Sequence, residues 1–438
     1  MKKGIKSRLI AMNFLQYAIW GAYLTSMGSY LGNAGLGANI GIFYAMQGIV
    51  SIFMPAIIGI IADKVLPAQK VLSICHGLAG AFMLAAGLYG MSAVGHTSFA
   101  TLFTLYSFSV AFYMPTIALS NSVAYSVLEN NGYDTVKDFP PIRVFGTVGF
   151  ICAMLFVNFV AIDGIQFQHS YNQFITSGVL GLVLCAYALT MPDCPCKKTQ
   201  GSTSIVDVFG LRAFTLFKRK DMAIFFIFSM LLGVSLQITN GFANPFITHF
   251  KAVPEFANEF FSENANFLIS FSQLSETLCI LLIPFCMKKF KIKGVMLIAM
   301  FCWVLRFGFF GIGDTGFPGV IWLFLSCLVY GMAFDFFNIS GSLYVNNQTD
   351  ESIRSSAQGL FMLMTNGIGA TVGTLSAQAI INAFTHYETI DGASYLMGNN
   401  ESSWSTVWLI FAGYALVVGI LFMILFKNPK PAVAEAAK

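Results

Sequence analysis

The chain has 438 residues, of which 56% are hydrophobic and only 10% carry a charge. A water-soluble globule of this size needs a far larger share of charged surface. The composition therefore excludes a soluble globule and indicates a polytopic membrane protein. The formal net charge of +4 reflects the orientation of the chain in a membrane rather than binding to nucleic acid.

Apolar stretches recur along the chain and are separated by short polar segments. A stretch of about 20 apolar residues is long enough to cross a hydrocarbon core about 30 Å thick. The pattern therefore predicts an all-α protein with twelve transmembrane helices. The expected spans are 8–31, 39–62, 70–92, 96–127, 142–162, 171–191, 221–250, 264–287, 294–313, 317–345, 355–384 and 403–427.

Lysine and arginine are distributed unevenly between the loops on the two sides of these spans. If the N-terminus is cytoplasmic, almost all of them fall on that side, and Lys251 stands nearly alone on the other. Cytoplasmic loops carry such an excess, so we expect both termini in the cytoplasm. The apolar stretch after MKKGIKSR is long and lacks a small-residue cleavage site, which favours a retained first helix over a signal peptide.

The longest connection divides the spans six and six. It predicts an N-terminal six-helix bundle over 1–191, a cytoplasmic linker over 192–220, a C-terminal bundle over 221–427 and a cytoplasmic tail over 428–438. The linker segment SIVDVFGLRAFTLFKRKD mixes apolar and basic residues, so it fits either a helix at the membrane surface or a simple tether. Two such bundles are the layout of the major facilitator superfamily, whose substrate site lies near the midplane between the halves.

A short motif supports this layout. Members of that superfamily carry Gly-x-x-x-Asp-Arg/Lys in the loop after the second helix, and GIIADKVLPAQK places Gly59, Asp63 and Lys64 there. The remainder of the signature is missing, so an ordinary charged turn is the alternative.

Polar residues inside two expected spans are spaced to share a helix face. An ionised group at the middle of a membrane costs roughly 2.5–3.5 kcal/mol on insertion scales, so such residues are candidates for a site. Glu276 lies near the middle of the eighth span, and Gln273 is three residues earlier, hence on the same face. Gln237 and Asn240 repeat that spacing in the seventh span.

The tenth span carries a third polar pair beside an aromatic edge. Asp335 and Asn338 are three residues apart, and Tyr330 and Phe334 are four apart on the same helix. Three spans of the C-terminal half, the seventh, the eighth and the tenth, thus each carry a polar stripe about one turn tall.

The N-terminal half offers a comparable stripe in DFPPIRVFGTVGF. Arg143, Thr147 and Phe150 recur there at helical spacing. Arg143 near a helix end can also extend to the lipid headgroups, and the sequence leaves both interpretations open.

Two other polar residues are set aside. Arg306 is expected to reach the membrane surface or to pair with Asp314, and His76 has no evident partner in the sequence. Neither is a site candidate.

Long motifs along nearly the whole chain resemble one family. They are MPAIIGIIADK, DFPPIRVFGTVGF, LQITN, ISFSQLSETL, VYGMAFDFFNISGS, IRSSAQG and TVWLIFAGY. Through them the chain resembles the nucleoside:proton symporters of bacterial inner membranes, a branch of the major facilitator superfamily. The resemblance implies import of nucleosides with protons by alternating access.

The resemblance also implies which residues bind the substrate. These are the residues at matching motif positions: Arg143, Thr147, Phe150, Gln237, Asn240, Gln273, Glu276, Tyr330, Phe334 and Asp335. The chemistry fits an uncharged nucleoside such as uridine or adenosine, because aromatic rings can stack on the base and amides and carboxylates can bind its edges and the ribose. Only Arg143 is available inside for a phosphate, which disfavours nucleotides.

The carboxylates Asp335 and Glu276 are the candidates for the coupled proton, because a low-dielectric cavity favours the neutral acid. Of the two, we favour Asp335.

We expect no metal, no cofactor beyond the co-transported proton, and a monomer. No nucleophile stands beside a base and no metal cluster is evident, which argues against an enzyme. A sugar or oligosaccharide proton symporter of the same fold is the alternative.

Overall fold

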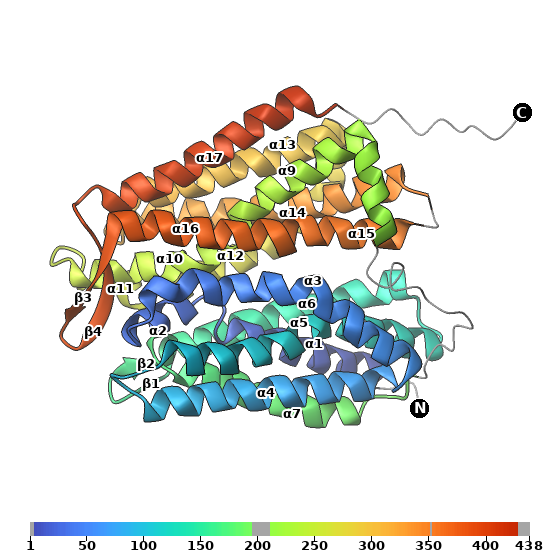
Figure 1. Ribbon diagram of the computed structural model, residues 1–438, viewed down its shortest axis with the longest axis horizontal. Helices are drawn as coiled ribbons and strands as arrows, with labels where there is room; N and C mark the ends of the chain where they lie inside the picture. The colour runs from blue at the N-terminus through green and yellow to red at the C-terminus, as the bar shows by residue number, and fades with distance from the viewer. Residues whose placement is uncertain (1–3, 195–210, 351–352, 428–438) are drawn as a thin grey trace, which may run out of the picture. The chain divides into compact units, whose positions relative to one another are not determined.

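The computed structural model describes residues 4–194, 211–350 and 353–427, and these residues are mostly helical (Figure 1). The packing of the backbone divides the chain into two units. Unit 1 comprises Met1–Ser202, Ile238–Ser270 and Thr374–Asn399. Unit 2 comprises Thr203–Gln237, Phe271–Gly373 and Asn400–Lys438.

Unit 1 contains the helices of the N-terminal half together with short segments of the C-terminal half. Its helices from the N-terminal half are α1 (Ile5–Gly21), α2 (Met27–Asn33), η1 (Gly37–Asn39), α3 (Ile40–Lys64), α4 (Ala68–Ser92), α5 (Phe99–Asn130), α6 (Thr135–Phe159), η2 (Phe167–His169) and α7 (Asn172–Leu189). The later segments are α10 (Ile238–His249), η4 (Phe250–Ala252), α11 (Phe260–Glu263), the start of α12 (Ala265–Ile280) and the end of α16 (Ala370–Phe384). The division into bundles at 1–191 and 221–427 therefore stays a prediction.

Glycines allow α1 and α6 to pack closely. A Cβ atom on Gly149 would overlap the backbone oxygen of Phe14, and one on Gly21 would overlap that of Phe150. No larger residue fits at these two contacts without moving a backbone. The contact fixes the face of α6 that carries the predicted site residues against α1.

Two antiparallel hairpins interrupt the expected all-α pattern. They are β1 (Ala161–Ile162) with β2 (Ile165–Gln166), and β3 (Thr385–Ile390) with β4 (Ala393–Gly398). Each turns through an Asp-Gly pair, Asp163-Gly164 and Asp391-Gly392, in which both residues have positive φ. This is the geometry of a two-residue type I′ turn, for which Asp-Gly is a preferred sequence.

Both hairpins lie at the end of unit 1 where α2 finishes (Figure 1). The side chain of Asn33, the last residue of α2, donates to the backbone oxygen of His169 at 2.9 Å. Its Oδ1 accepts from the backbone N–H of Ser394 at 2.8 Å. One asparagine thus joins α2 to the connection after β2 and to β4.

Unit 2 is built around a buried aromatic core. Its elements are η3 (Leu211–Lys218), α9 (Lys220–Leu236), the end of α12, α13 (Ile283–Ile312), α14 (Val320–Gln348), α15 (Arg354–Met362), the π-helix η5 (Leu363–Gly369), the start of α16 and α17 (Ser403–Leu425). Trp408 stacks on Phe310 with ring centroids 4.8 Å apart, and Trp303 is equally buried on α13.

Ten helical segments of the described residues are long and apolar enough to span a membrane. The first and eighth expected spans are helical but shorter. A turn over residues 22–26 separates α1 from α2, and α12 ends at Ile280, after which Pro284 enters the first turn of α13. Proline suits the first turn of a helix because its missing N–H would be unpaired there anyway. The count of twelve stays a prediction.

The sequence also predicted a surface helix in the linker, a cytoplasmic tail and a loop motif at Gly59, Asp63 and Lys64. Residues 195–210 of the linker and the tail over 428–438 lie outside the described residues, so the surface helix is not tested over most of its length. Gly59 lies on α3, which continues to Lys64, so the motif lies on the last turns of a helix and not in a loop. The side chains of Asp63 and Lys64 are outside the described set.

Candidate functional site

In unit 1, Arg143 lies on the face of α6 that packs against α1. The guanidinium carbon is 3.9 Å from the centre of the Tyr17 ring. A Cβ atom on Gly146 would lie 2.9 Å from Nη1 of Arg143 and 2.6 Å from the Tyr17 ring, so a glycine is required for this contact. A cation above an aromatic face is stabilised by the ring quadrupole. Arg143 is thus held on Tyr17, and its role as a site residue stays a prediction.

The aromatic member of this stripe is also fixed by α1. Phe150 is buried, and its ring meets that of Trp20 edge-on at 6.3 Å. Trp20 Nε1 donates to Oε1 of Gln47 at 3.3 Å, which sets the orientation of the indole. Thr147 lies between Arg143 and Phe150 on α6 and is half-buried. The structure brings the three predicted residues of α6 onto one face beside Tyr17 and Trp20.

A buried hydrogen-bonded chain lies beneath this face. Nε2 of His76 is 2.7 Å from Oε1 of Gln16, and Nε2 of Gln16 donates to Oγ1 of Thr116 at 2.8 Å. The prediction that His76 has no partner was wrong. Its partner lies on α1, 60 residues away, and helix packing rather than spacing creates the pair.

In unit 2, α12 and α14 approach closely at a glycine. A Cβ atom on Gly331 would lie 2.5 Å from the backbone oxygen of Ser275 and 2.7 Å from the nitrogen of Glu276. The hydroxyl of Ser275 in turn donates to the backbone oxygen of Leu328. These contacts align the polar stripe of α12 with that of α14.

We call the resulting surface the carboxylate face; it comprises Gln273, Glu276, Tyr330, Phe334 and Asp335. Tyr330 and Phe334 stack with ring centroids 5.8 Å apart and an interplanar angle of 12°. The side chains of Gln273, Glu276 and Asp335 all lie close enough to the Tyr330 hydroxyl to interact with it. Asp335 is buried, whereas Gln273 and Glu276 are half-buried. The structure therefore brings together five of the predicted site residues.

Arg306 also belongs beside this face, which the sequence did not predict. It is only 2% exposed, and Nη1 donates to the backbone oxygen of Ser326 at 2.8 Å and to Oγ of Ser272 at 3.3 Å. Its guanidinium carbon lies 4.3 Å from the centre of the Tyr330 ring. The expectation that Arg306 reaches the membrane surface or pairs with Asp314 was wrong. The signal that could have identified it is a charge within an apolar span, which marks a site by default.

The remaining predicted pair lies at a helix junction. Gln237 follows the last residue of α9, and Asn240 lies in the first turn of α10. Both side chains are half-buried. The two units divide between residues 237 and 238, so Gln237 belongs to unit 2 and Asn240 to unit 1, with Arg143, Thr147 and Phe150.

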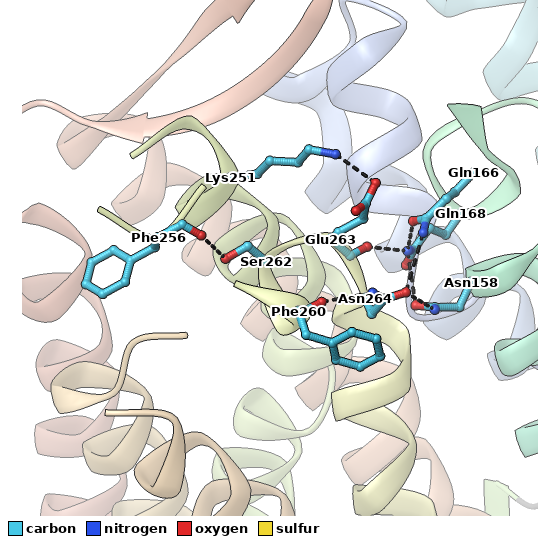
Figure 2. Close-up of polar contacts among 9 residues, drawn as sticks. All are labelled: Asn158, Gln166, Gln168, Lys251, Phe256, Phe260, Ser262, Glu263 and Asn264. Carbon is cyan, nitrogen blue, oxygen red and sulfur yellow. Dashed lines mark hydrogen bonds and ion pairs between the residues drawn. The ribbon is translucent and has the colours of Figure 1, made fainter. Parts of the chain in front are cut away.

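A second polar region, at the hairpin end of unit 1, was missed by the sequence analysis. We call it the amide cluster; it comprises Asn158, Gln166, Gln168, Asn244, Asn264 and Asn266, part of which appears in Figure 2. Asn158 Nδ2 donates to Oδ1 of Asn264 at 2.8 Å, and Gln168 Nε2 donates to Oδ1 of Asn158 at 3.0 Å. The cluster thus joins α6 and η2 to the start of α12.

Further bonds connect α10 and α2 to the amide cluster. Asn244 Nδ2 donates to Oε1 of Gln168 at 3.2 Å and to Oδ1 of Asn266 at 2.9 Å. Ser29 donates to Asn244, and Thr25 donates to Asn266 at 2.9 Å. Every member of the cluster is neutral, so its burial requires hydrogen bonds but no paired charge. The available signal was compositional, since amides crowd the short segments IQFQHSYNQF and SENANF.

One ion pair flanks the amide cluster. Nζ of Lys251 lies 2.9 Å from Oε1 of Glu263, and the backbone oxygen of Glu263 accepts from Gln168 at 3.0 Å (Figure 2). Both side chains of the pair are more than a third exposed, so the pair contributes little energy itself. The bond from Gln168 to the backbone of Glu263 is what holds α11 beside the cluster.

No group of three or more His, Cys, Asp or Glu side chains is arranged to hold a metal ion in the described part of the chain.

A family model described as nucleoside H+ symporter matches residues 3–431. The chain belongs to the nucleoside H+ symporter family. This confirms the family predicted from the motifs.

Individual relatives agree with this membership. The xanthosine permease of Escherichia coli (strain K12) is 47% identical over 426 residues, which cover 97% of this chain and 96% of that protein. The nucleoside permease NupG of the same strain is 44% identical over 425 residues, covering 97% and 96%. These relatives are transporters, so this family member is a transporter and not an enzyme.

Solved structures show the same fold. A crystal structure of the nucleoside transporter NupG matches with a TM-score of 0.84 at 42% identity, covering 98% of this chain and 100% of that one. A peptide transporter of the POT type matches with a TM-score of 0.68 at 13% identity, covering 96% and 95%. The second likeness concerns the fold alone.

Proposed function

We propose that this nucleoside H+ symporter imports nucleosides such as uridine or adenosine with protons by alternating access. The observation that carries the proposal is the carboxylate face, where stacked aromatic rings, an amide and two carboxylates converge. Stacked rings bind the planar base without requiring charge, while amide and carboxylate groups recognise its polar edges and the ribose hydroxyls. We place the protein in the bacterial inner membrane as a monomer, with both termini in the cytoplasm.

The substrate-binding residues we propose come from both units. Unit 2 supplies Gln237 and the carboxylate face. Unit 1 supplies Arg143, Thr147, Phe150 and Asn240. The face of α6 supports this role, because its aromatic and cationic side chains are already fixed by Tyr17 and Trp20. Rings held in place before binding lose less conformational entropy when the base stacks on them.

We assign the coupled proton to Asp335 or Glu276, and favour Asp335 because it is the more deeply buried. A buried carboxylate is destabilised as an anion, so a proton and a substrate can bind together. Arg306 lies beside Tyr330 and contributes a fixed positive charge near the same ring. A positive charge that stays in place favours release of the proton once the substrate has left.

We further propose that the amide cluster closes one end of the transport path. It joins α2, α6 and η2 from the N-terminal half to α10 and the start of α12 from the C-terminal half. This is the end opposite the basic loops, so we assign it to the external side. Breaking its hydrogen bonds would let the two halves separate there, as alternating access requires.

The test uses purified protein in proteoliposomes and tritiated uridine. We expect an inward pH gradient to drive accumulation by about tenfold for each pH unit and each proton moved. Asp335→Asn should abolish accumulation but preserve exchange of internal for external uridine, because the neutral amide imitates the protonated acid. Glu276→Gln tests the second carboxylate in the same way.

Two outcomes would contradict the proposal. If both variants still concentrate uridine in response to pH, neither carboxylate carries the proton. If sugars compete with uridine and other nucleosides do not, the protein transports a different substrate class.

A further inference from the structure

A cavity of about 450 Å³ lies in unit 1, beneath the β3–β4 hairpin. Its wall is formed by the hairpin, α2, the end of α4, the connection after β1 and the end of α10. Small-molecule sites in proteins enclose about 300–1,000 Å³, so a nucleoside fits this volume. None of the residues proposed above for substrate binding lines it.

The hairpin is fixed over this cavity by close contacts with α2 and η1. The ring of Tyr387 lies directly on two glycines, because a Cβ atom on Gly32 would come within 2.6 Å of it and one on Gly37 would overlap it. The bond from Ser394 to Asn33 holds the other strand. The β3–β4 hairpin, which covers the cavity, is therefore held in place by specific contacts with α2 and η1.

Two tyrosine hydroxyls of the lining are buried and have no hydrogen-bond partner among the described residues. They belong to Tyr30, whose side chain is 4% exposed, and to Tyr387. The Tyr30 hydroxyl lies against the backbone of Gly90, where it leaves no room for a Cβ atom. A buried polar group left unsatisfied costs about 1–3 kcal/mol, so a ligand that bonds these hydroxyls would be favoured.

The charged side chains that line the cavity favour a neutral ligand. Lys251 and Glu263 line it but bond to each other at 2.9 Å, as Figure 2 shows. Burial lowers the pKa of His169 to about 4, with Lys251 acting in the same direction and Glu263 against it, so this ring is uncharged at neutral pH. Asp391 supplies the one remaining formal charge among the described lining residues. A phosphorylated ligand would find no unpaired cation in this described lining.

Aromatic rings complete the wall. Tyr171 and Tyr395 line the cavity together with Tyr30 and Tyr387. Four tyrosines, a neutral imidazole and the amide of Gln166 offer stacking faces and hydrogen bonds but no positive field. This is the chemistry that recognises a planar, uncharged base bearing hydroxyl groups.

We infer that this cavity is a second nucleoside-binding site, occupied before the substrate reaches the carboxylate face. The inference rests on the proposed function, since it assigns the same substrate class to a separate site. Ser29 and Gln166 belong both to the cavity wall and to the hydrogen-bond network of the amide cluster. A nucleoside in the cavity therefore contacts the groups that hold this end closed.

The test is equilibrium binding of tritiated uridine to the full-length protein in lipid nanodiscs. We expect the wild type to bind two uridines per chain. Tyr30→Phe and Tyr387→Phe each remove one hydroxyl but keep the ring, so each should weaken one of the two sites by about three- to tenfold. Ala393→Trp should fill the cavity and abolish uridine binding there. Glu276→Gln should weaken binding only at the carboxylate face.

The matched control is Tyr125→Phe, which removes a hydroxyl from a tyrosine of α5 outside the cavity. It should leave both sites unchanged. If the wild type binds one uridine per chain, and Tyr30→Phe, Tyr387→Phe and Ala393→Trp bind one uridine with the same affinity, the second site does not exist. If the wild type binds and transports no uridine, the proposed function itself fails.

Photochemical labelling covers the case in which a cavity variant does not fold. Wild-type protein is irradiated with 4-thiouridine, and the labelled peptides are identified by mass spectrometry. Labelling within residues 385–398 supports the second site. Labelling confined to α12 and α14 overturns it.

Discussion

Two buried polar regions of this symporter differ in their chemistry. The carboxylate face of unit 2 holds two carboxylates beside the guanidinium of Arg306, whereas the amide cluster of unit 1 contains only neutral side chains. Charged groups in a low-dielectric region respond strongly to protonation, and amides do not. The comparison teaches that proton coupling and closure can be assigned to separate parts of the molecule.

The two regions also differ in how their side chains are fixed. The carboxylate face is set by a backbone contact between two helices at Gly331. The amide cluster is set by side-chain hydrogen bonds among several elements, each of which can break and re-form separately. A rigid binding surface and a reversible closure would be expected to differ in this way.

The largest effect should follow from removing the charge beside Tyr330. Arg306→Leu loses a charged hydrogen bond to the backbone oxygen of Ser326 and the contact with the ring. Hydrogen bonds to charged groups contribute about 1.5–3 kcal/mol. On the proposal that this bond keeps Arg306 in place to support the Tyr330 ring for the base, its loss should lower uridine affinity by about ten- to a hundredfold. Binding of tritiated uridine across pH 5 to 8 measures this.

Arg306→Lys separates charge from packing, because lysine keeps the charge but cannot reproduce the planar contact. If lysine restores the pH profile but not the affinity, Arg306 acts through its charge on the proton and through its shape on Tyr330. Wild-type affinity in the leucine variant would show that Arg306 does not position the ring.

The next largest effect tests the closure. Asn158→Ala removes bonds to Asn264, Gln168 and the backbone N–H of Phe267. Leaving such partners unsatisfied costs about 1–3 kcal/mol, so hydrogen exchange of residues 263–267 should accelerate about five- to a hundredfold.

Asn130→Ala is the matched control, since that side chain is exposed and bonds to Ser126 within its own helix. It should leave exchange at 263–267 unchanged. Equal exchange in the Asn158 variant and the wild type would mean that the amide cluster does not hold this end closed.

A smaller effect is expected from a single methyl group at the helix contact of the carboxylate face. Gly331→Ala places its Cβ 2.5 Å from the backbone oxygen of Ser275, so α12 and α14 must move apart. Overpacking of this kind costs about 1–3 kcal/mol, and the thermal unfolding temperature in detergent should fall.

Gly308→Ala on α13 is the control, because a Cβ there meets nothing within 4 Å. A Gly331 variant as stable as the Gly308 variant would show that the two helices can accommodate the methyl group.

The smallest effect concerns pH at the hairpin end. Burial lowers the pKa of His169 from 6.5 to about 4 in this structure, where Lys251 and Glu263 are its charged neighbours. A depressed histidine pKa means that the open form binds the proton more tightly, so closure weakens as pH falls below about 6.5, by up to about tenfold per pH unit. Hydrogen exchange of 385–398 at pH 7.5 and 5.5 measures this.

His169→Gln should make that exchange independent of pH over the same range, after correction for the intrinsic exchange rate. A wild type without such dependence would show that His169 does not report on closure.

The sequence predicted the carboxylate face better than any other region. Gln273 with Glu276, and Tyr330 with Asp335, each lie on one helix, and helical periodicity alone places each set on one face. Their convergence across α12 and α14 depends on Gly331 and on the resemblance to the family, not on spacing.

The hairpins are absent from the sequence predictions although their signal is present. Asp163-Gly164 and Asp391-Gly392 are each flanked by residues that favour strands, and Asp-Gly is a strong turn sequence. Long apolar stretches dominate the composition, and strands this short stand out little between them. The amide cluster and the His76–Gln16 pair could not be predicted from one sequence, because their partners lie far apart along the chain.

The neutrality of the amide cluster has a consequence for ionic strength. Salt weakens interactions between charged groups by screening, but it has little effect on hydrogen bonds between amides. If the amide cluster closes this end as proposed, the closure should have the same strength in dilute and in concentrated salt.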